Sequence, residues 1–177
     1  MQPTTVDVME RKSFADMDCS VAQCLEIIGE WWTMLIVRDV FLGVSRFEDF
    51  QRRLGISRNI LQQRLTKLVE AGVLIRVPYS DHPPRDDYRL TGKGRDLWPI
   101  LTAMRQWGDA HAAPDGPPIE VVHDACGHTD PLVLMCPACG EPVGLRDVHA
   151  VSGPGRHGGL IPEGRAPTQS ATPPRRS

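Results

Sequence analysis

The residues best suited to chemistry are histidines and cysteines near the C-terminal end of the chain. Two residues lie between His123 and Cys126, two lie between Cys136 and Cys139, and nine residues separate the two pairs. Thiolate sulfur and imidazole nitrogen are the ligands that hold tetrahedral Zn²⁺, and three cysteines with one histidine would fill its coordination sphere. The spacing therefore predicts a structural zinc site, with His128 as a competing fourth ligand.

The surroundings of these pairs leave the chemistry open between metal binding and thiol chemistry. A glycine follows each second cysteine, strand-like runs at 120–122 and 132–135 precede the pairs, and the segment resembles a small zinc ribbon. One alternative is a metal-free hairpin, and another is a thiol oxidoreductase that uses Cys136 and Cys139. No strand–helix–strand pattern surrounds the second pair, and no paired carboxylates or phosphate-binding loop occur. We therefore expect the chain not to be an enzyme.

A fourth candidate for thiol chemistry, Cys19, precedes a capping sequence at 20–23 that predicts a helix ending near residue 28. A thiol at the start of a helix is more reactive, because the helix dipole favours the thiolate. Cys19 is therefore a candidate redox sensor, and an inert thiol is the alternative. The apolar stripe of this helix is expected in the core, and it comprises Val21, Cys24, Leu25 and Ile28.

Capping signals between residues 45 and 72 predict two helices joined by a tight turn. A capping box at residues 45–48 predicts a first helix over 46–54, which a left-handed Gly55 should end. Ser57 can cap a second helix over 58–70. Such a pair is typical of a helix-turn-helix, whose second helix enters the major groove of DNA.

The second helix has an apolar face and a polar face. Leu61, Leu65 and Leu68 share one face and are expected to be buried. The opposite face carries amides, a hydroxyl and a lysine, which can contact base edges and phosphates, although a polar surface that binds nothing is the alternative. The expected DNA contacts are Ser57, Arg58, Asn59, Gln62, Gln63, Thr66 and Lys67, with Arg46 beside them.

Local charge favours the DNA-binding interpretation. Residues 46–76 contain seven Arg or Lys residues against three acidic ones, a net charge of +4, whereas the whole chain carries −2. A concentration of cations on one segment is the electrostatic footprint of phosphate binding.

Three further elements should position this segment. Residues 30–43 predict a buried central helix, with the core candidates Trp31, Trp32, Leu35, Ile36, Val40 and Phe41. Strands at 73–79 and 87–91, joined by a proline-containing loop with Arg85 at its tip, predict a wing that touches DNA, or a hairpin that only completes the core.

Thr91 should cap a long helix over 92–112, kinked at Pro99. That helix has an apolar stripe too long to bury on a small domain, which predicts a homodimer; the stripe comprises Leu97, Ile100, Leu101, Met104 and Trp107.

Length and composition limit the class of protein to which the chain can belong. The chain has 177 residues, of which 41% are hydrophobic, and it contains neither an apolar run long enough for a membrane span nor an apolar signal segment. We expect a cytoplasmic protein, mainly α with a small β wing (α+β). Its expected parts are an N-terminal arm (1–18), a DNA-binding and dimerisation domain (19–112), a linker (113–118), a β-rich zinc-ribbon-like module (119–151) and a disordered tail (152–177).

The pattern from Cys19 to about Ala112 resembles the HxlR-type winged helix-turn-helix transcriptional regulators of bacteria. The residues that carry the resemblance are Cys19, Gly29, Trp31, Trp32, Arg46, Phe47, Phe50, Ile56, Ser57, Leu61, Leu65, Leu68, Ala71, Gly72, Pro84, Arg85, Tyr88, Leu90, Thr91, Gly94 and Trp107.

The resemblance implies a homodimer that binds a pseudo-palindromic operator in promoter DNA through a recognition helix (58–70) and a wing (79–87). It implies control of nearby genes in response to a small molecule or to thiol stress, with a repressor expected and an activator as the alternative. Some relatives sense electrophiles through a cysteine at the place of Cys19. The family ends after the long helix, so the Cys/His segment is an addition. A winged-helix module that binds protein is the alternative.

Overall fold

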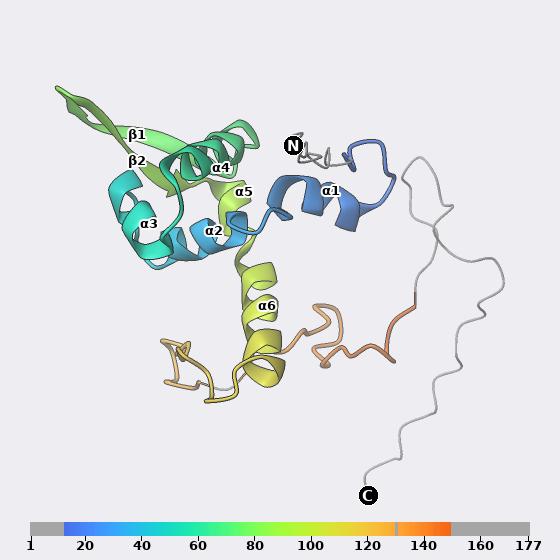
Figure 1. Cartoon of the computed structure of the whole chain (residues 1–177). Coiled ribbons are helices and arrows are strands. Elements are labelled where there is room, and N and C mark those ends of the chain that lie inside the picture. The colour runs from blue at the N-terminus through green and yellow to red at the C-terminus, as the bar shows by residue number, and fades with distance from the viewer. Residues whose placement is uncertain (1–12, 130, 150–177) are drawn as a thin grey trace, which may run out of the picture. The chain divides into compact units, whose positions relative to one another are not determined.

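The structure of the chain is a computed structural model that describes residues 13–129 and 131–149. It divides into two units, Met1–Trp98 and Pro99–Ser177. The first unit combines helices with one two-stranded antiparallel sheet, so it has the predicted α+β class (Figure 1). The predicted tail and most of the predicted arm lie outside the described residues, and the predicted domain limits stay predictions. None of the described helices is long and apolar enough to cross a membrane.

The first helix, α1, runs from Ser20 to Ile28 and ends where the sequence predicts. The predicted capping box is wrong, because Cys19 is the N-cap and no side chain caps the helix. The Gln23 amide instead donates to three carbonyl groups of the preceding segment, at 2.8–3.1 Å. Fewer residues of the predicted apolar stripe are buried than expected: Ile28 is buried, whereas Val21 and Leu25 are exposed.

The central helix, α2, extends over Thr33–Phe41 and begins later than the apolar run suggests. Ile36 and Val37 are completely buried. The prediction for Trp31 is wrong, since its side chain is 91% exposed. Trp31 lies in the turn before the helix, so the helical periodicity that would point it inward does not apply to it.

The two helices of the helix-turn-helix are α3 (Phe47–Leu54) and α4 (Arg58–Glu70). Gly55 has the left-handed conformation predicted for it, with φ of 65°. The Ser57 hydroxyl caps α4 by accepting the Ile60 N–H at 3.3 Å, also as predicted. Leu61, Leu65 and Leu68 are buried, which confirms the apolar face of α4.

The capping box expected at the start of α3 is wrong. Arg46 is the N-cap, and no side chain caps the helix. The Ser45 hydroxyl donates instead to the Asp87 carboxylate at 3.1 Å, and the Ser45 carbonyl accepts the Tyr88 N–H at 2.8 Å. Ser45, in the segment before α3, therefore bonds to β2 of the sheet instead of capping the helix.

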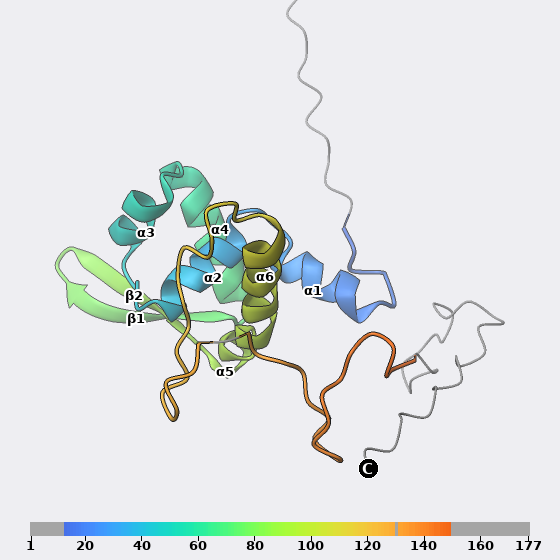
Figure 2. The same cartoon turned by 90° about the horizontal axis from the view of Figure 1, so that it is seen from below.

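The sheet consists of β1 (Leu74–Asp81) and β2 (Pro84–Leu90), paired antiparallel. The strands are longer than predicted, and only residues 82 and 83 connect them. Arg85 consequently lies within β2, opposite Ser80, rather than at a loop tip. Figures 1 and 2 both show this hairpin projecting from the helices of the first unit.

The predicted continuous helix after the sheet is wrong, because the chain forms α5 (Gly92–Arg95) and α6 (Trp98–His111). Thr91 caps α5 as predicted, accepting the Gly94 N–H at 3.1 Å. Pro99 cannot donate a hydrogen bond to the carbonyl group four residues earlier, and its ring would clash with that carbonyl, so a continuous helix through it is disfavoured. In the first turn of α6, where that N–H has no helical partner anyway, Pro99 is favourable and produces no kink.

The core of the first unit lies between α2, α3, α4 and the inner end of the sheet. Phe50 of α3 meets Tyr88 of β2 edge to face, with ring centroids 6.3 Å apart. The largest completely buried apolar side chains are Phe50, Ile36, Leu61, Leu65, Leu68, Leu74, Val37 and Val73.

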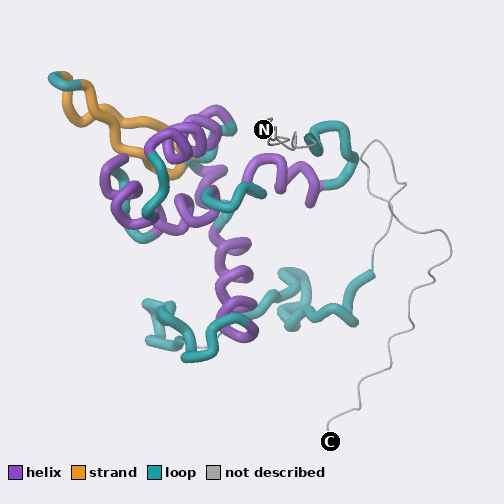
Figure 3. The backbone as a smooth tube through the Cα atoms, viewed as in Figure 1, coloured by secondary structure: helices purple, strands orange, loops and turns teal. Residues whose placement is uncertain are grey.

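In the second unit, α6 is followed by chain without extended strands in its described part (Figure 3). The predicted strands are wrong: the described part of this segment has only two isolated bridges, His123 with His128 and Met135 with Pro142. None of the described residues from 119 to 149 is buried. The β-rich module expected there therefore has no core of its own that could align longer strands.

Candidate nucleic-acid interface

The outer face of α4 is polar because the leucine face of this helix is committed to the core. The Gln62 amide donates to the Thr66 hydroxyl at 3.2 Å, which orients the amide along the helix. Its other N–H and its carbonyl oxygen stay on the surface, where they match the paired donor and acceptor of an adenine edge. The predicted contacts that are exposed here are Ser57, Arg58, Asn59, Gln62, Gln63 and Lys67, and Thr66 is half-buried.

A cation is held at the beginning of α4. The Arg58 guanidinium lies 5.0 Å from the centroid of the Phe47 ring, an arrangement in which the ring attracts the charge. The same end of the helix carries the positive end of its dipole and the first free N–H groups. Together these groups form a suitable site for a DNA phosphate.

Arg46 connects the helix-turn-helix to the wing. Its guanidinium lies 4.7 Å from the centroid of the Tyr79 ring, and its Nε lies 3.8 Å from the Asp87 carboxylate. Tyr79 was missed by the sequence reasoning, because no local pattern links residues in separate elements. Only the register of the hairpin brings its ring to Arg46.

The positive charge available to DNA is smaller than the sequence count suggests. Arg64 forms an ion pair with Glu30 at 2.9 Å, Arg52 pairs with Asp49, and Arg53 pairs with the buried Asp39. Each of these cations already has an acidic partner, which reduces the charge that it offers to a phosphate. The exposed cations outside these three pairs include Arg46, Arg58, Lys67 and Arg85, of which Arg46 lies beside Asp87.

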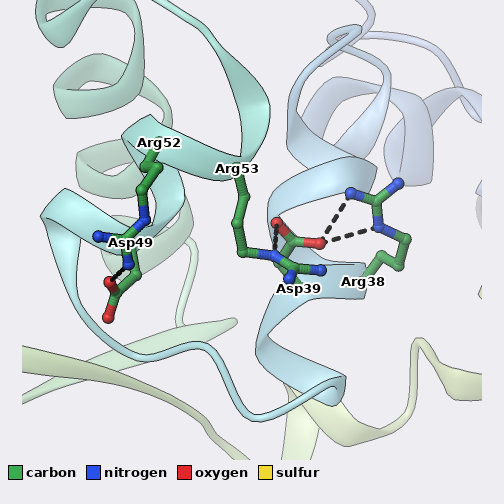
Figure 4. A network of polar contacts seen from close by, with 5 residues as sticks. All are labelled: Arg38, Asp39, Asp49, Arg52 and Arg53. Carbon is green, nitrogen blue, oxygen red and sulfur yellow. Dashed lines mark hydrogen bonds and ion pairs between the residues drawn. The ribbon is translucent and has the colours of Figure 1, made fainter.

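Asp39 of α2 attaches α3, the first helix of the helix-turn-helix, to the core. Its carboxylate is completely buried and accepts hydrogen bonds from Arg38 Nε and Nη2 at 2.9 and 2.7 Å (Figure 4). Arg53 of α3 reaches the other carboxylate oxygen at 3.3 Å. A buried charge is tolerated only with such charged donors. The network joins α2 to the last turn of α3, and no sequence pattern indicated it.

The base of the wing contains a buried ionisable residue, Tyr88. Burial raises the pKa of the Tyr88 phenol, and this effect outweighs the opposing attraction of Arg76, whose guanidinium lies 5.9 Å from the Tyr88 ring centroid. Tyr88 therefore stays neutral where β2 enters the core. Arg85 is exposed near the far end of the same strand, at the place where a wing can reach a DNA backbone.

The candidate metal ligands form two pairs. His123 Nδ1 lies 3.1 Å from Cys126 Sγ, and the backbone N–H groups of Cys139 and Ala138 lower the pKa of the Cys136 thiol. Among the described residues, no three His, Cys, Asp or Glu side chains lie close enough to hold a metal ion together. The four-ligand zinc site therefore stays a prediction, and so does redox sensing by the half-buried Cys19.

Known proteins resemble the chain over most of its length. Residues 27–115 match the family of the HxlR-like helix-turn-helix. The chain is 49% identical over 138 residues to the uncharacterised HTH-type transcriptional regulator Rv3095 of Mycobacterium tuberculosis, covering 77% of this chain and 87% of that protein.

Two solved structures agree in fold. PA1607, a candidate transcription factor, is 41% identical with a TM-score of 0.70, and the match covers 79% of this chain and 99% of that one. PA1374 from Pseudomonas aeruginosa, also a candidate transcription factor, is 39% identical with a TM-score of 0.58, and the match covers 78% and 95% of the two chains.

Proposed function

Because this chain belongs to the HxlR-like helix-turn-helix family, we propose that it binds a pseudo-palindromic operator in promoter DNA as a homodimer and represses the adjacent genes. The family and the matched relatives are transcriptional regulators, and the chain is accordingly a DNA-binding regulator rather than an enzyme. The observation that carries the proposal is the exposed polar face of α4 above a completely apolar buried face. A protein that acts on promoter DNA in a bacterium must reach the chromosome, so the proposal includes a cytoplasmic location.

Different side chains have different roles in this proposal. Asn59, Gln62 and Gln63 read base edges in the major groove, since amides pair with both a donor and an acceptor on adenine. Arg58 and Lys67 contact phosphates on either side, which sets the position of α4 but reads no sequence. On the wing side Arg46 and Arg85 contact the backbone of the adjacent segment, while Ser57 and Thr66 orient the helix end and the Gln62 amide.

The proposed dimer uses the apolar face of α6. Ile100, Met104 and Trp107 recur at helical spacing, and their side chains are 38%, 52% and 65% exposed. A second copy of this helix is the partner that suits a two-fold symmetric operator, because an isologous interface presents the same face from both protomers. Two recognition helices would then read half-sites about one helical turn apart.

The proposed signal is a small molecule or thiol stress, with Cys19 as the candidate sensor. Cys19 is the N-cap of α1 and its side chain is half-buried, so a reagent can reach it from the surface. Release of DNA by the thiol oxidant diamide should be lost in Cys19→Ser and kept in Cys24→Ser. If both variants release DNA as the wild type does, Cys19 is not the sensor.

The decisive experiment compares two duplexes at two salt concentrations. Full-length protein should bind the region upstream of its own gene more tightly than a scrambled duplex, with affinity falling as salt rises. Gln63→Ala should lose about 1–3 kcal/mol on the upstream duplex and little on the scrambled one. Lys67→Ala is the matched control, since a phosphate contact should weaken both duplexes alike and reduce the salt slope by about one.

The outcome also separates the proposal from its main competitor. Equal and weak binding of both duplexes, with Gln63→Ala reducing both to the same extent, would contradict base reading by α4. That result would favour a winged-helix module that binds protein.

A further inference from the structure

Two turns in the second unit are copies of one another. In the first turn (123–128) the His123 N–H donates to the His128 carbonyl at 2.8 Å. In the second turn (136–141) the Cys136 N–H donates to the Glu141 carbonyl, also at 2.8 Å. The two turns therefore close in the same way over the same number of residues, and both contain Ala-Cys-Gly at the same three positions. We call them the first and second knuckles.

The glycines complete the likeness. Gly127 and Gly140 donate their N–H groups to the carbonyls of the first residue of their knuckles, at 2.7 and 2.8 Å. Their φ angles are 72° and 73°, a left-handed conformation that glycine adopts without strain. Each knuckle thus reverses direction directly after its cysteine.

Each knuckle carries two candidate ligands at equivalent positions of its turn. In the first, the 3.1 Å contact between His123 Nδ1 and Cys126 Sγ puts a nitrogen and a sulfur together. In the second, the matching positions of the same backbone turn are occupied by Cys136 and Cys139.

The repeat decides between the two histidines. His123 occupies the position that Cys136 has in the second knuckle, at the start of the turn. His128 corresponds to Glu141, whose position contributes a backbone carbonyl that closes the turn. The ligand position is therefore that of His123.

The segment has no other obvious source of stability. None of its described residues from 119 to 149 is buried, and the apolar side chains of Leu132, Val133 and Leu134 are exposed. Modules of this size without a core usually need a disulfide or a metal to fold. All the cysteines described in the structure are free.

We propose that one Zn²⁺ ion joins the two knuckles through His123, Cys126, Cys136 and Cys139. Thiolate and imidazole ligands suit zinc, and four of them leave no open position for catalysis. The described residues hold the ligands as two separate pairs. Binding of the ion draws the pairs together, displaces the thiol protons and so folds the segment between them.

The test measures zinc in full-length protein after an EDTA wash, by mass spectrometry of the metal. We expect one zinc per chain in the wild type, none in Cys136→Ser or His123→Ala, and one in the controls His128→Ala and Cys24→Ser. Binding of the upstream duplex by each variant shows that its first unit is folded. Apoprotein titrated with Co²⁺ should give the visible absorption of a tetrahedral site with thiolate ligands.

Three outcomes would overturn the proposal. The first is a wild-type protein without zinc whose Co²⁺ titration gives no tetrahedral absorption. The second is zinc retention by Cys136→Ser that equals the wild type. The third is a disulfide between Cys136 and Cys139 in the freshly purified protein, which would indicate a redox pair instead.

Discussion

Replacement of Gly94 by alanine should destabilise the first unit, because the fold leaves no space for a Cβ atom at this position. A Cβ there would lie 2.2 Å from the Val73 carbonyl oxygen and 2.9 Å from Leu90 Cδ2. The leucine side chain can rotate away, but the carbonyl belongs to backbone. It accepts hydrogen bonds from the Thr91 N–H at 3.1 Å and the Thr91 hydroxyl at 3.2 Å, which hold it in place.

The size of the effect follows from these contacts. Inserting a methyl group into packed structure costs about 1–3 kcal/mol, and a clash with backbone belongs at the upper end of that range. Moving the Val73 carbonyl also weakens its hydrogen bond from the Thr91 N–H, worth about 1 kcal/mol net, whereas the Thr91 hydroxyl keeps its shorter bond to the Gly72 carbonyl at 2.6 Å. We expect a loss of about 3–4 kcal/mol in the free energy of unfolding. For a unit of this size such a loss lowers the melting temperature by more than about 10 °C.

Gly92 provides a matched control in the same short helix. A Cβ at Gly92 would meet no atom within 4 Å, and alanine is favoured over glycine in a helix by about 0.5–1 kcal/mol. Urea unfolding followed by tryptophan fluorescence should therefore place Gly92→Ala at or above the wild type and Gly94→Ala well below it. The reasoning is refuted if the two variants differ by less than about 0.5 kcal/mol.

Two further predictions concern buried ionisable groups. Asp39→Ala should lose about 2–4 kcal/mol of unfolding free energy, near the lower end for a broken buried pair, because Arg38 and Arg53 are 38% and 48% exposed and can return to water. Arg53→Ala leaves Asp39 bonded to Arg38 and should lose less in the same urea assay; the reverse order would contradict this account. Burial raises the pKa of Tyr88 above its ordinary value of 10.0, so the stability that the neutral phenol contributes is complete below that pH and declines above it. Unfolding measured at neutral pH and above pH 10.0 should show a smaller alkaline loss in Tyr88→Phe than in the wild type, and equal losses would count against the assignment.

The helix-turn-helix could be derived from the sequence because its signals are local. The cap at Ser57, the left-handed Gly55 and the leucine periodicity of α4 all act within a few residues, so they specify the helix without knowledge of its neighbours. The same holds for the two knuckles, whose glycines lie next to the cysteines that they serve. The polar face of α4 follows directly from that periodicity.

Tertiary structure decided what depends on residues far apart in the chain. Ser45 could cap α3 by its spacing, but its hydroxyl bonds to Asp87, 42 residues away, since the wing docks there. Trp31 has the composition of a core residue and lies outside, because α2 begins only at Thr33.

The electrostatics of the DNA-binding surface show the same division. Sequence alone determined that cations gather between residues 46 and 76 and that α4 has a polar face. Only the folded chain determined which of these cations are paired, because Arg53 forms an ion pair with Asp39 of α2 and Arg64 forms one with Glu30. The physical reason is that apolar periodicity and the preference of glycine for a left-handed turn act within a few residues, whereas an ion pair between distant residues needs two segments packed against one another.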